Sequence, residues 1–314
     1  VAMGDSALFN NGLSVINPWD ATGNTAIGSK ALYSNTVGYE NVANGQNVLY
    51  YNITGARNTG SGYSALFRNT GGFENVAYGY QALYTNNIGY GNTANGYAAL
   101  FFNTTGIHNA AYGKTALFNN TTGYSNVAVG ISALFRNTIR NNLVAIGDSS
   151  LYNNGLGAIL FFESTNNVAV GSKVLFANTT GFANSALGFQ SLSSNTTGSK
   201  NTAIGENAGY YNKEGFGNSF FGKGAGLWNV SGNCNSFFGR IAGYFNTTGY
   251  SNVAIGSDAL LSNTIRSNLV AIGDSALYNN GLSIVNPWDG TRNTAIGSKG
   301  LYNNTAGAYN TSVG

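Results

Sequence analysis

The sequence predicts an all-β fold, a parallel β-solenoid (β-roll) of stacked coils, and three observations support this prediction. A glycine recurs at fixed spacings along all 314 residues. Small apolar residues and asparagines recur at fixed distances from that glycine. The segments between turn-forming residues are short and rich in β-branched and aromatic residues, without the three-to-four spacing of a helix. Such a period, sustained to both ends, indicates a single solenoid array over residues 1–314, in which each coil packs mainly on its neighbours.

One repeat is seventeen residues long, as in Asn109 to Ser125 (NAAYGKTALFNNTTGYS), and contains an Ala-x-Gly step. Consecutive repeat glycines are seventeen residues apart fourteen times and twenty-four residues apart three times, because three coils carry seven-residue insertions. The chain starts in mid-repeat and stops on a repeat glycine, so we expect it to be a segment of a longer repeat protein. The repeat glycines are Gly4, Gly28, Gly45, Gly62, Gly79, Gly96, Gly113, Gly130, Gly147, Gly171, Gly188, Gly205, Gly222, Gly239, Gly256, Gly273, Gly297 and Gly314.

Within each repeat, the two residues before the glycine and the five after it are expected to be extended, with Asn-Thr-Thr-Gly forming the corner. Alanine two places before the glycine and leucine four places after it predict a narrow core. Leucine becomes glycine at Gly209, Gly226 and Gly243, and alanine becomes phenylalanine at Phe220 and Phe237. We interpret this as an exchange of volume inside the core, in which one glycine lacks a matching phenylalanine.

Two columns of asparagine predict hydrogen-bonded ladders at the corners. One column lies four places before the glycine and is interrupted at Leu143 and Leu269. The other lies seven places after the glycine in every repeat. Stacked coils would bring equivalent amides to about 4.8 Å from one another, where each can donate to the next. The ladder seven places after the glycine consists of Asn11, Asn35, Asn52, Asn69, Asn86, Asn103, Asn120, Asn137, Asn154, Asn178, Asn195, Asn212, Asn229, Asn246, Asn263, Asn280 and Asn304.

Ten Asn-x-Ser/Thr sequons occur, and seven of them fall on this ladder. An asparagine that points inward cannot carry sugar, so we favour a structural role for these residues over glycosylation. A tyrosine or phenylalanine usually lies five places after the glycine and predicts a stack of aromatic rings.

The residue just before the glycine points away from the core by strand alternation, yet it is usually apolar. A strip of this kind, about 80 Å long at the strand spacing, exceeds what a soluble monomer usually exposes. We therefore predict a homo-oligomer packed along it, more loosely near the polar residues Asn44, Ser61 and Asn95. The predicted interface comprises Ile27, Tyr78, Val129, Ile146, Val170, Ile204, Phe221, Phe238, Ile255, Ile272 and Ile296.

The insertions at 13–19, 156–162 and 282–288 all follow a ladder asparagine. Two interpretations of them remain open, folding back over their own coil or contacting another chain. Their candidate contact residues are Trp19, Phe161, Phe162 and Trp288. Each insertion coil also carries two matched carboxylates, for which solvated turn caps are favoured over a calcium site because further ligands are not evident. These pairs are Asp5 with Asp20, Asp148 with Glu163, and Asp274 with Asp289.

The sequence offers little for catalysis, and we expect neither an enzyme nor a bound metal or cofactor. His108 is the single histidine and is expected at a surface corner, and Cys234 is the single cysteine and is expected to be a small turn residue. The stretch Gly217 to Gly224 (GNSFFGKG) departs from a phosphate-binding loop at its last position. Charged residues make up 8% of the chain and the net charge is +3, which argues against nucleic-acid partners, and no apolar run is long enough for membrane insertion.

Units such as Asn24 to Gly28 (NTAIG), Asn126 to Gly130 (NVAVG) and Asn252 to Gly256 (NVAIG) resemble the repeat of trimeric autotransporter adhesin heads. That resemblance implies a left-handed β-roll wound as a homotrimer, on repeats that are usually fourteen residues long. The Ser-Phe-Phe-Gly variants at Ser219 to Gly226 and Ser236 to Gly243 are similar to repeat arrays of bacterial surface and phage tail-fibre proteins.

Three functional hypotheses follow. The first, implied by the resemblance and the array, is a non-enzymatic structural protein of an extracellular filament, fibre or adhesin stalk at the cell surface, whose partner is itself as a trimer or filament. The alternative is a carbohydrate-binding receptor-binding protein of the phage tail-fibre type, with host-surface or matrix glycans as partners. An ice-binding face is disfavoured because the threonines gather in corners.

Overall fold

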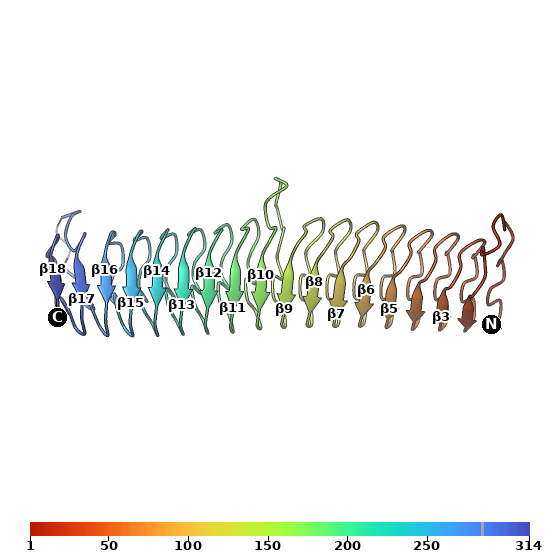
Figure 1. The fold of residues 1–314 in the computed structure, drawn as a ribbon, viewed down its shortest axis with the longest axis horizontal. Coiled ribbons are helices and arrows are strands. Elements are labelled where there is room, and N and C mark those ends of the chain that lie inside the picture. The colour runs from red at the N-terminus through yellow and green to blue at the C-terminus, as the bar shows by residue number, and fades with distance from the viewer. Residues whose placement is uncertain (284–285) are drawn as a thin grey trace. The chain divides into compact units, whose positions relative to one another are not determined.

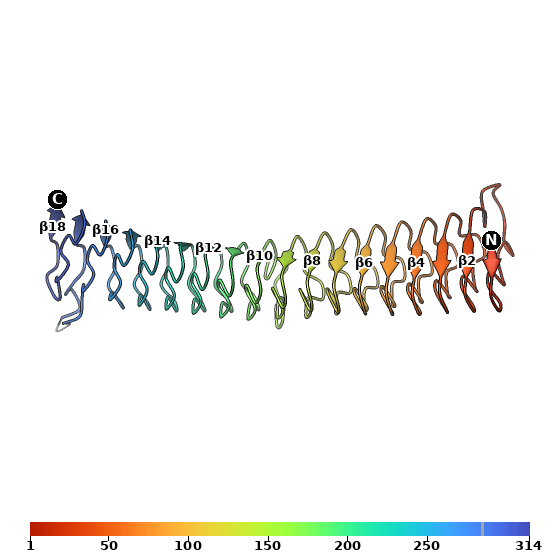
Figure 2. The same cartoon turned by 90° about the horizontal axis from the view of Figure 1, so that it is seen from below.

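A computed structural model describes residues 1–283 and 286–314, and its regular structure consists of short β-strands joined by turns (Figures 1 and 2). The chain divides into two compact units, which we describe one at a time: unit 1 is Val1–Leu156 and unit 2 is Gly157–Gly314. Each unit is a parallel β-solenoid, as the sequence predicts. No described residue belongs to a helix that could cross a membrane.

Each coil contributes one strand, which ends directly before the repeat glycine. Figure 1 shows the strands of each unit side by side in chain order. Unit 1 contains β1 Ala2–Met3, β2 Thr25–Ile27, β3 Val42–Asn44, β4 Thr59–Ser61, β5 Val76–Tyr78, β6 Thr93–Asn95, β7 Ala110–Tyr112, β8 Val127–Val129 and β9 Val144–Ile146. Unit 2 contains β10 Val168–Val170, β11 Ser185–Leu187, β12 Thr202–Ile204, β13 Ser219–Phe221, β14 Ser236–Phe238, β15 Val253–Ile255, β16 Val270–Ile272, β17 Thr294–Ile296 and β18 Thr311–Val313.

Neighbouring strands pair in parallel and in register with the repeat. In unit 1, for example, Ala128 of β8 pairs with Ala145 of β9. The middle residue of a strand points into the coil and is buried, as Ala128 shows, while the residues on either side of it face outward. The predicted alternation of inward and outward residues is therefore confirmed for these strands.

The five residues after the glycine are not extended, which corrects the sequence prediction. The second and fourth of them adopt left-handed backbone conformations, with φ of 58° at Lys30 and 50° at Leu32. Their amides still bond from coil to coil, since the amide of Leu32 donates to the Val48 carbonyl at 3.0 Å. A left-handed conformation costs a non-glycine residue about 1–2 kcal/mol. It persists here because burial of the leucine and these hydrogen bonds fix the backbone.

The core of each coil is narrow, as predicted. Alanine before the glycine and leucine after it are fully buried through most of both units, as in Ala77 and Leu83. These two side chains fill the space that the strand and the turns enclose, and few larger groups fit inside.

The phenylalanine–glycine exchange in unit 2 is more complete than the sequence suggests. A Cβ atom added to Gly226 would lie 2.4 Å from the Phe220 ring, and one added to Gly209 would lie 2.6 Å from the same ring. Phe220 therefore fills space beside two glycines, and Phe237 fills it beside Gly243 at 2.4 Å. The three glycines also have φ of 58° to 60°. The exchange thus removes the backbone strain that leucine carries at this place.

The predicted aromatic stack is continuous in unit 1. Nine rings follow one another with centroid separations of 5.0 to 5.3 Å, all among residues 1–156, which the structure describes in full. Such stacks add packing energy to the coil-to-coil contact and hold the corner rigid. The stacked residues are Phe9, Tyr33, Tyr50, Phe67, Tyr84, Phe101, Phe118, Phe135 and Tyr152.

Candidate functional site

The asparagine ladder seven places after the glycine is confirmed as a structural element. Asn103 is fully buried, and its Nδ2 donates to Asn86 Oδ1 at 2.7 Å and to the Gly106 carbonyl at 3.1 Å. Its Oδ1 accepts from Asn120 Nδ2 at 2.9 Å. The same pattern recurs in unit 2, where Asn229 donates to Asn212 at 2.7 Å. The amide of Asn103 is thereby satisfied by its neighbours within the low-dielectric corner, whereas the buried Oδ1 of Asn263, one coil before the third insertion, accepts no hydrogen bond from the described residues.

The column four places before the glycine forms a second ladder. In unit 1, Asn92 Nδ2 donates to Asn75 Oδ1 at 3.1 Å and to the Gly106 carbonyl at 2.8 Å. The Gly106 carbonyl accepts from Asn103 as well, so one glycine carbonyl joins the two ladders in each regular coil. Seven sequon asparagines on the first ladder are fully buried: Asn52, Asn103, Asn120, Asn178, Asn195, Asn229 and Asn246. Burial of these amides leaves no room for sugar in the folded chain, as the structural interpretation expects.

Both gaps in the ladder four places before the glycine lie one coil before an insertion, a relation that was not predicted from the sequence. Leu143 and Leu269 replace asparagine there, and each coil also has arginine in place of the corner glycine, Arg140 and Arg266. Both arginine side chains are buried. Arg266 Nη1 and Nη2 donate to the carbonyls of Pro287 and Asn286 at 2.6 and 3.3 Å. Arg266 therefore anchors the insertion that follows it.

The hydrogen-bond geometry explains why these replacements occur together. A Cβ atom on a regular corner glycine, such as Gly106, would lie 2.5 Å from the carbonyl oxygen of Gly123 in the next coil. Where the next coil carries an insertion, its chain leaves the corner, so a larger residue fits at the glycine position. The two-residue signal, Arg and Leu in place of Gly and Asn, was present in the sequence and could have been found by comparing the two coils.

The insertions do not fold back fully over their coils. Phe161 is 87% exposed, Trp288 is 64% exposed and Trp19 is 57% exposed, while Phe162 is 41% exposed and packs edge-on against Phe182 at 5.3 Å. Figure 1 shows residues 157–163, in green, rising past the corners of the coils that follow them. In the third insertion, residues 284 and 285 lie outside the described part of the chain. Exposure leaves these aromatic residues available for contact with another molecule.

The insertion carboxylates act as caps of turns. Asp20 Oδ2 accepts from the amides of Ile16 and Asn17 at 2.9 and 2.8 Å, and Glu163 Oε2 accepts from the amide of Leu160 at 2.9 Å. Within the described residues, no three metal-ligating side chains gather in one place. The turn-cap interpretation is therefore confirmed for Asp20 and Glu163.

Hydrogen bonds from the amides of Asn17 and Ile16 lower the pKa of Asp20 below its ordinary value of 3.8. A lowered folded pKa means that the cap stabilises the insertion above pH 3.8 and is lost as pH falls through the folded pKa. We expect Trp19 fluorescence, in a Trp228→Phe, Trp288→Phe background, to change below pH 3.8. The variant Asp20→Asn should lose that transition, and its persistence in this variant would assign the transition to another group.

The outward row of the strands is apolar throughout unit 2. All nine residues that directly precede the repeat glycines are exposed or half-buried there, and residues 284 and 285 do not belong to this row. Phe221 and Phe238 stack at 4.7 Å, and a depression of about 200 Å³ lies between Val170, Leu187 and Ile204. The row is Val170, Leu187, Ile204, Phe221, Phe238, Ile255, Ile272, Ile296 and Val313.

A groove of about 1130 Å³ runs along one corner of unit 1. Its two walls flank the buried asparagine ladder that lies seven places after the glycines. One wall consists of the residues six places after each glycine, Tyr51, Arg68, Thr85, Phe102, Asn119 and Arg136. The other wall consists of the residues eight places after it, Ile53, Thr70, Asn87, Thr104, Thr121 and Thr138, with Leu156 at the end. This groove was not predictable from the sequence, because neither wall is a conspicuous column of one residue type.

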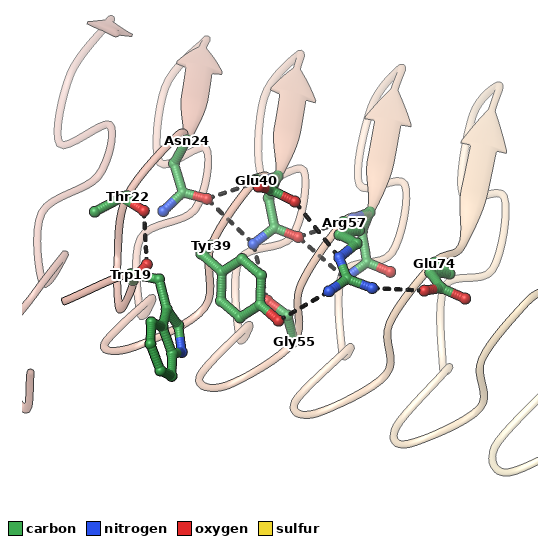
Figure 3. A network of polar contacts seen from close by, with 10 residues as sticks. Trp19, Thr22, Asn24, Tyr39, Glu40, Gly55, Arg57 and Glu74 are labelled. Carbon is green, nitrogen blue, oxygen red and sulfur yellow. Dashed lines mark hydrogen bonds and ion pairs between the residues drawn. The ribbon is translucent and has the colours of Figure 1, made fainter. Parts of the chain in front are cut away.

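A polar network occupies another corner of unit 1, before the strands (Figure 3). Arg57 lies between Glu40 and Glu74, with N–O distances of 3.4 and 2.8 Å, and contacts the hydroxyl of Tyr39 at 3.3 Å. The hydrogen bond to Glu74 raises the pKa of Arg57 further above its ordinary value. Exposed pairs of this kind contribute little stability, although Arg57 links the coils that carry Glu40 and Glu74.

The structure does not bring the remaining candidate residues together into one site. His108 is exposed at a corner and packs edge-on against Tyr90 at 5.1 Å. Cys234 is an exposed free thiol in a turn with φ of 56°. In the stretch Gly217 to Gly224, Ser219 to Phe221 form β13 and Phe220 is fully buried in the core. That stretch is therefore a regular coil segment and not a phosphate-binding loop.

Comparisons of the chain with protein-family models, curated proteins and solved structures found no match. The fold therefore defines the class, a parallel β-solenoid repeat protein with asparagine ladders. The resemblance to adhesin heads and tail fibres, with the handedness and trimer that it implies, stays a prediction.

Proposed function

We propose that this chain is a non-enzymatic structural protein of an extracellular filament, fibre or adhesin stalk, which assembles with copies of itself. The observation that carries the proposal is the outward apolar row of unit 2. Its nine side chains lie on consecutive strands, and none of them is polar or charged. A contiguous apolar face of this kind is unusual on a soluble monomer and typical of a contact surface. A homotrimer or a filament of parallel chains would bury it.

The test is the assembly state of a chain whose row is interrupted. Asparagine is a suitable replacement because unit 1 carries Asn44 and Asn95 at the same outward place in β3 and β6. Burial of a phenylalanine or isoleucine contributes about 1.5–3 kcal/mol. We therefore expect Phe238→Asn with Ile255→Asn to weaken association by at least about 100-fold. Sedimentation velocity over a concentration series measures this change.

The matched control places the same kind of exchange on another face of unit 2. Phe216 and Tyr250 are exposed at the corner before the strands, with 51% and 52% of their surfaces accessible. Phe216→Asn with Tyr250→Asn should leave the assembly unchanged. A wild-type chain that sediments as a monomer at every concentration, or equal effects of the two double variants, would contradict the proposal.

A second candidate function, carbohydrate binding, is favoured by the groove in unit 1. Its walls combine aromatic rings, hydroxyl groups, amides and guanidinium groups, a combination that suits a polyhydroxylated ligand. The groove runs parallel to the stacking direction of the coils, so a long polymer lying in it would meet one position of each wall per coil. This candidate is compatible with a structural role, because the groove residues and the outward residue before the glycine occupy different positions of the repeat.

A further inference from the structure

We propose that the groove of unit 1 binds an extended anionic polysaccharide, a polymer of sugar rings that carry carboxylate or sulfate groups. The inference rests on the second candidate function and specifies its ligand class. Three features of the groove lead to it: two fixed aromatic rings, two arginines without an acidic partner, and wall amides that mostly donate to the next coil already.

The aromatic rings are held in place by the stack beneath them. Tyr51 meets the rings of Tyr50 and Phe67 edge-on, at 4.7 and 5.2 Å with interplanar angles of 71° and 83°. Phe102 repeats this geometry three coils later against Phe101 and Phe118, at 4.7 and 5.2 Å with angles of 77° and 86°. Both rings remain more than 40% exposed. A rigid, exposed ring offers an apolar surface to the C–H face of a sugar at little entropic cost.

The arginines give the groove its charge. Arg68 and Arg136 are exposed, and no described carboxylate forms an ion pair with either of them. The Arg136 guanidinium lies 6.0 Å from the centre of the Tyr152 ring, and this contact orients the guanidinium group. No aspartate or glutamate lines the groove. Arg57 of the same unit, in contrast, is neutralised by Glu40 and Glu74. A groove with guanidinium groups and no acid favours carboxylate or sulfate, which arginine binds through two parallel hydrogen bonds.

The spacing of these groups follows the coils. Arg68 and Arg136 lie four coils apart, which corresponds to about 19 Å at the strand spacing. Between them the walls present threonine and asparagine side chains, whose hydroxyl and amide groups match sugar hydroxyls. The ligand must therefore be long and extended, with charges that are separated by several neutral groups.

This pattern disfavours two other extended ligands. A single-stranded nucleic acid carries a phosphate on every nucleotide, and two arginines would leave most of these charges without a partner. A peptide that adds as a β-strand needs free backbone amides. The amides of Thr70, Gly71 and Gly72 at the groove wall all donate to the Asn87 carbonyl of the next coil at 3.0 to 3.1 Å.

The experiment measures binding of the full chain to four polymers by titration calorimetry: hyaluronate as the carboxylated probe, κ-carrageenan as the sulfated probe, neutral dextran, and oligo(dT). In both anionic probes, neutral sugars alternate with charged ones, as the spacing of the arginines requires. We expect one of the two anionic polysaccharides to bind best, and the comparison between them identifies the anion. Arg68→Gln with Arg136→Gln should weaken that binding by at least about tenfold, because both charge-assisted contacts are lost.

The matched control removes the same charge elsewhere in unit 1. Lys30 and Lys114 are exposed and lie outside the groove. Lys30→Gln with Lys114→Gln should change the affinity by less than about twofold, because exposed charges at a distance are screened by salt. An equal loss in both double variants would show non-specific attraction and overturn the proposal.

A third variant separates this inference from the function on which it rests. Tyr51→Ser with Phe102→Ser should weaken binding of both charged and neutral polysaccharides. Binding of neutral dextran as tight as that of the anionic polymers would overturn the anionic class and leave carbohydrate binding in place. Failure of all three polysaccharides to bind, or preferential binding of oligo(dT), would overturn both the anionic ligand class and the carbohydrate-binding function.

Discussion

The variant Gly113→Ala should be strongly destabilised, although it adds only one methyl group. Gly113 has φ of 130°, a region that L side chains rarely adopt, and such strain costs about 1–3 kcal/mol. An added Cβ would also lie 2.6 Å from the Gly130 carbonyl oxygen and 2.8 Å from its carbonyl carbon. Backbone atoms of the next coil cannot move aside without breaking the hydrogen bonds between the parallel strands. We expect a lower thermal midpoint and faster amide exchange in coils on both sides of Gly113.

Gly71→Ala is the matched control for this prediction. Gly71 lies in unit 1, does not have a positive φ, and its added Cβ would first meet the Thr54 side chain at 3.2 Å. A side chain can adjust by a few tenths of an ångström, so this variant should stay within about 1 kcal/mol of the wild type. Equal midpoints for the two alanine variants would refute the requirement for glycine at the repeat position.

The variant Asn103→Asp should be nearly as damaging, although the side chain keeps its size. The carboxylate loses both donors, so an oxygen of Asp would face Asn86 Oδ1 and the Gly106 carbonyl, two acceptors that Nδ2 now contacts at 2.7 and 3.1 Å. An unpaired buried charge typically destabilises a protein by about 3–5 kcal/mol. Thermal unfolding at pH 7 measures the loss.

The pH dependence of this variant has a definite sign. Burial without donors raises the pKa of the new carboxyl group above its unfolded value of about 3.9. The folded state then binds the proton more tightly than the unfolded state does. The loss of stability relative to the wild type is therefore smallest below that unfolded pKa and grows as pH rises through the folded pKa. Asn95→Asp, on the outward side of β6 in the adjoining part of the same coil, is the control. It should show neither the deficit nor the pH dependence, and a matching deficit there would indicate a general charge effect.

The fold was predictable because equivalent places of successive repeats carry the same residue types, so each structural environment is represented many times in the sequence. Alanine inside the strand, leucine after the glycine and asparagine at two corners each recur, so burial could be inferred from columns instead of from single residues. The conformation after the glycine was not predictable in this way. Leucine and β-branched residues suggest extended backbone, yet Leu32 has φ of 50° because the coil must turn within a few residues. Here tertiary packing overrides local preference.

The candidate surfaces were predictable only in part. The outward apolar row follows from strand alternation, which is a one-dimensional rule. The groove does not, because its walls come from two positions on either side of a buried asparagine and vary from coil to coil, as Tyr51, Arg68 and Thr85 show. What these residues share is a location, and that location becomes visible only when the turn geometry is known.

The dependence of an insertion on Arg266 in the preceding coil has a consequence for how such arrays grow and can be engineered. A loop grafted into a new coil by itself would face a glycine corner that cannot hold it, while an arginine introduced without its loop would collide with the neighbouring backbone. The smallest transferable cassette is therefore two successive coils, and recombination at the boundary between them would separate a loop from its support.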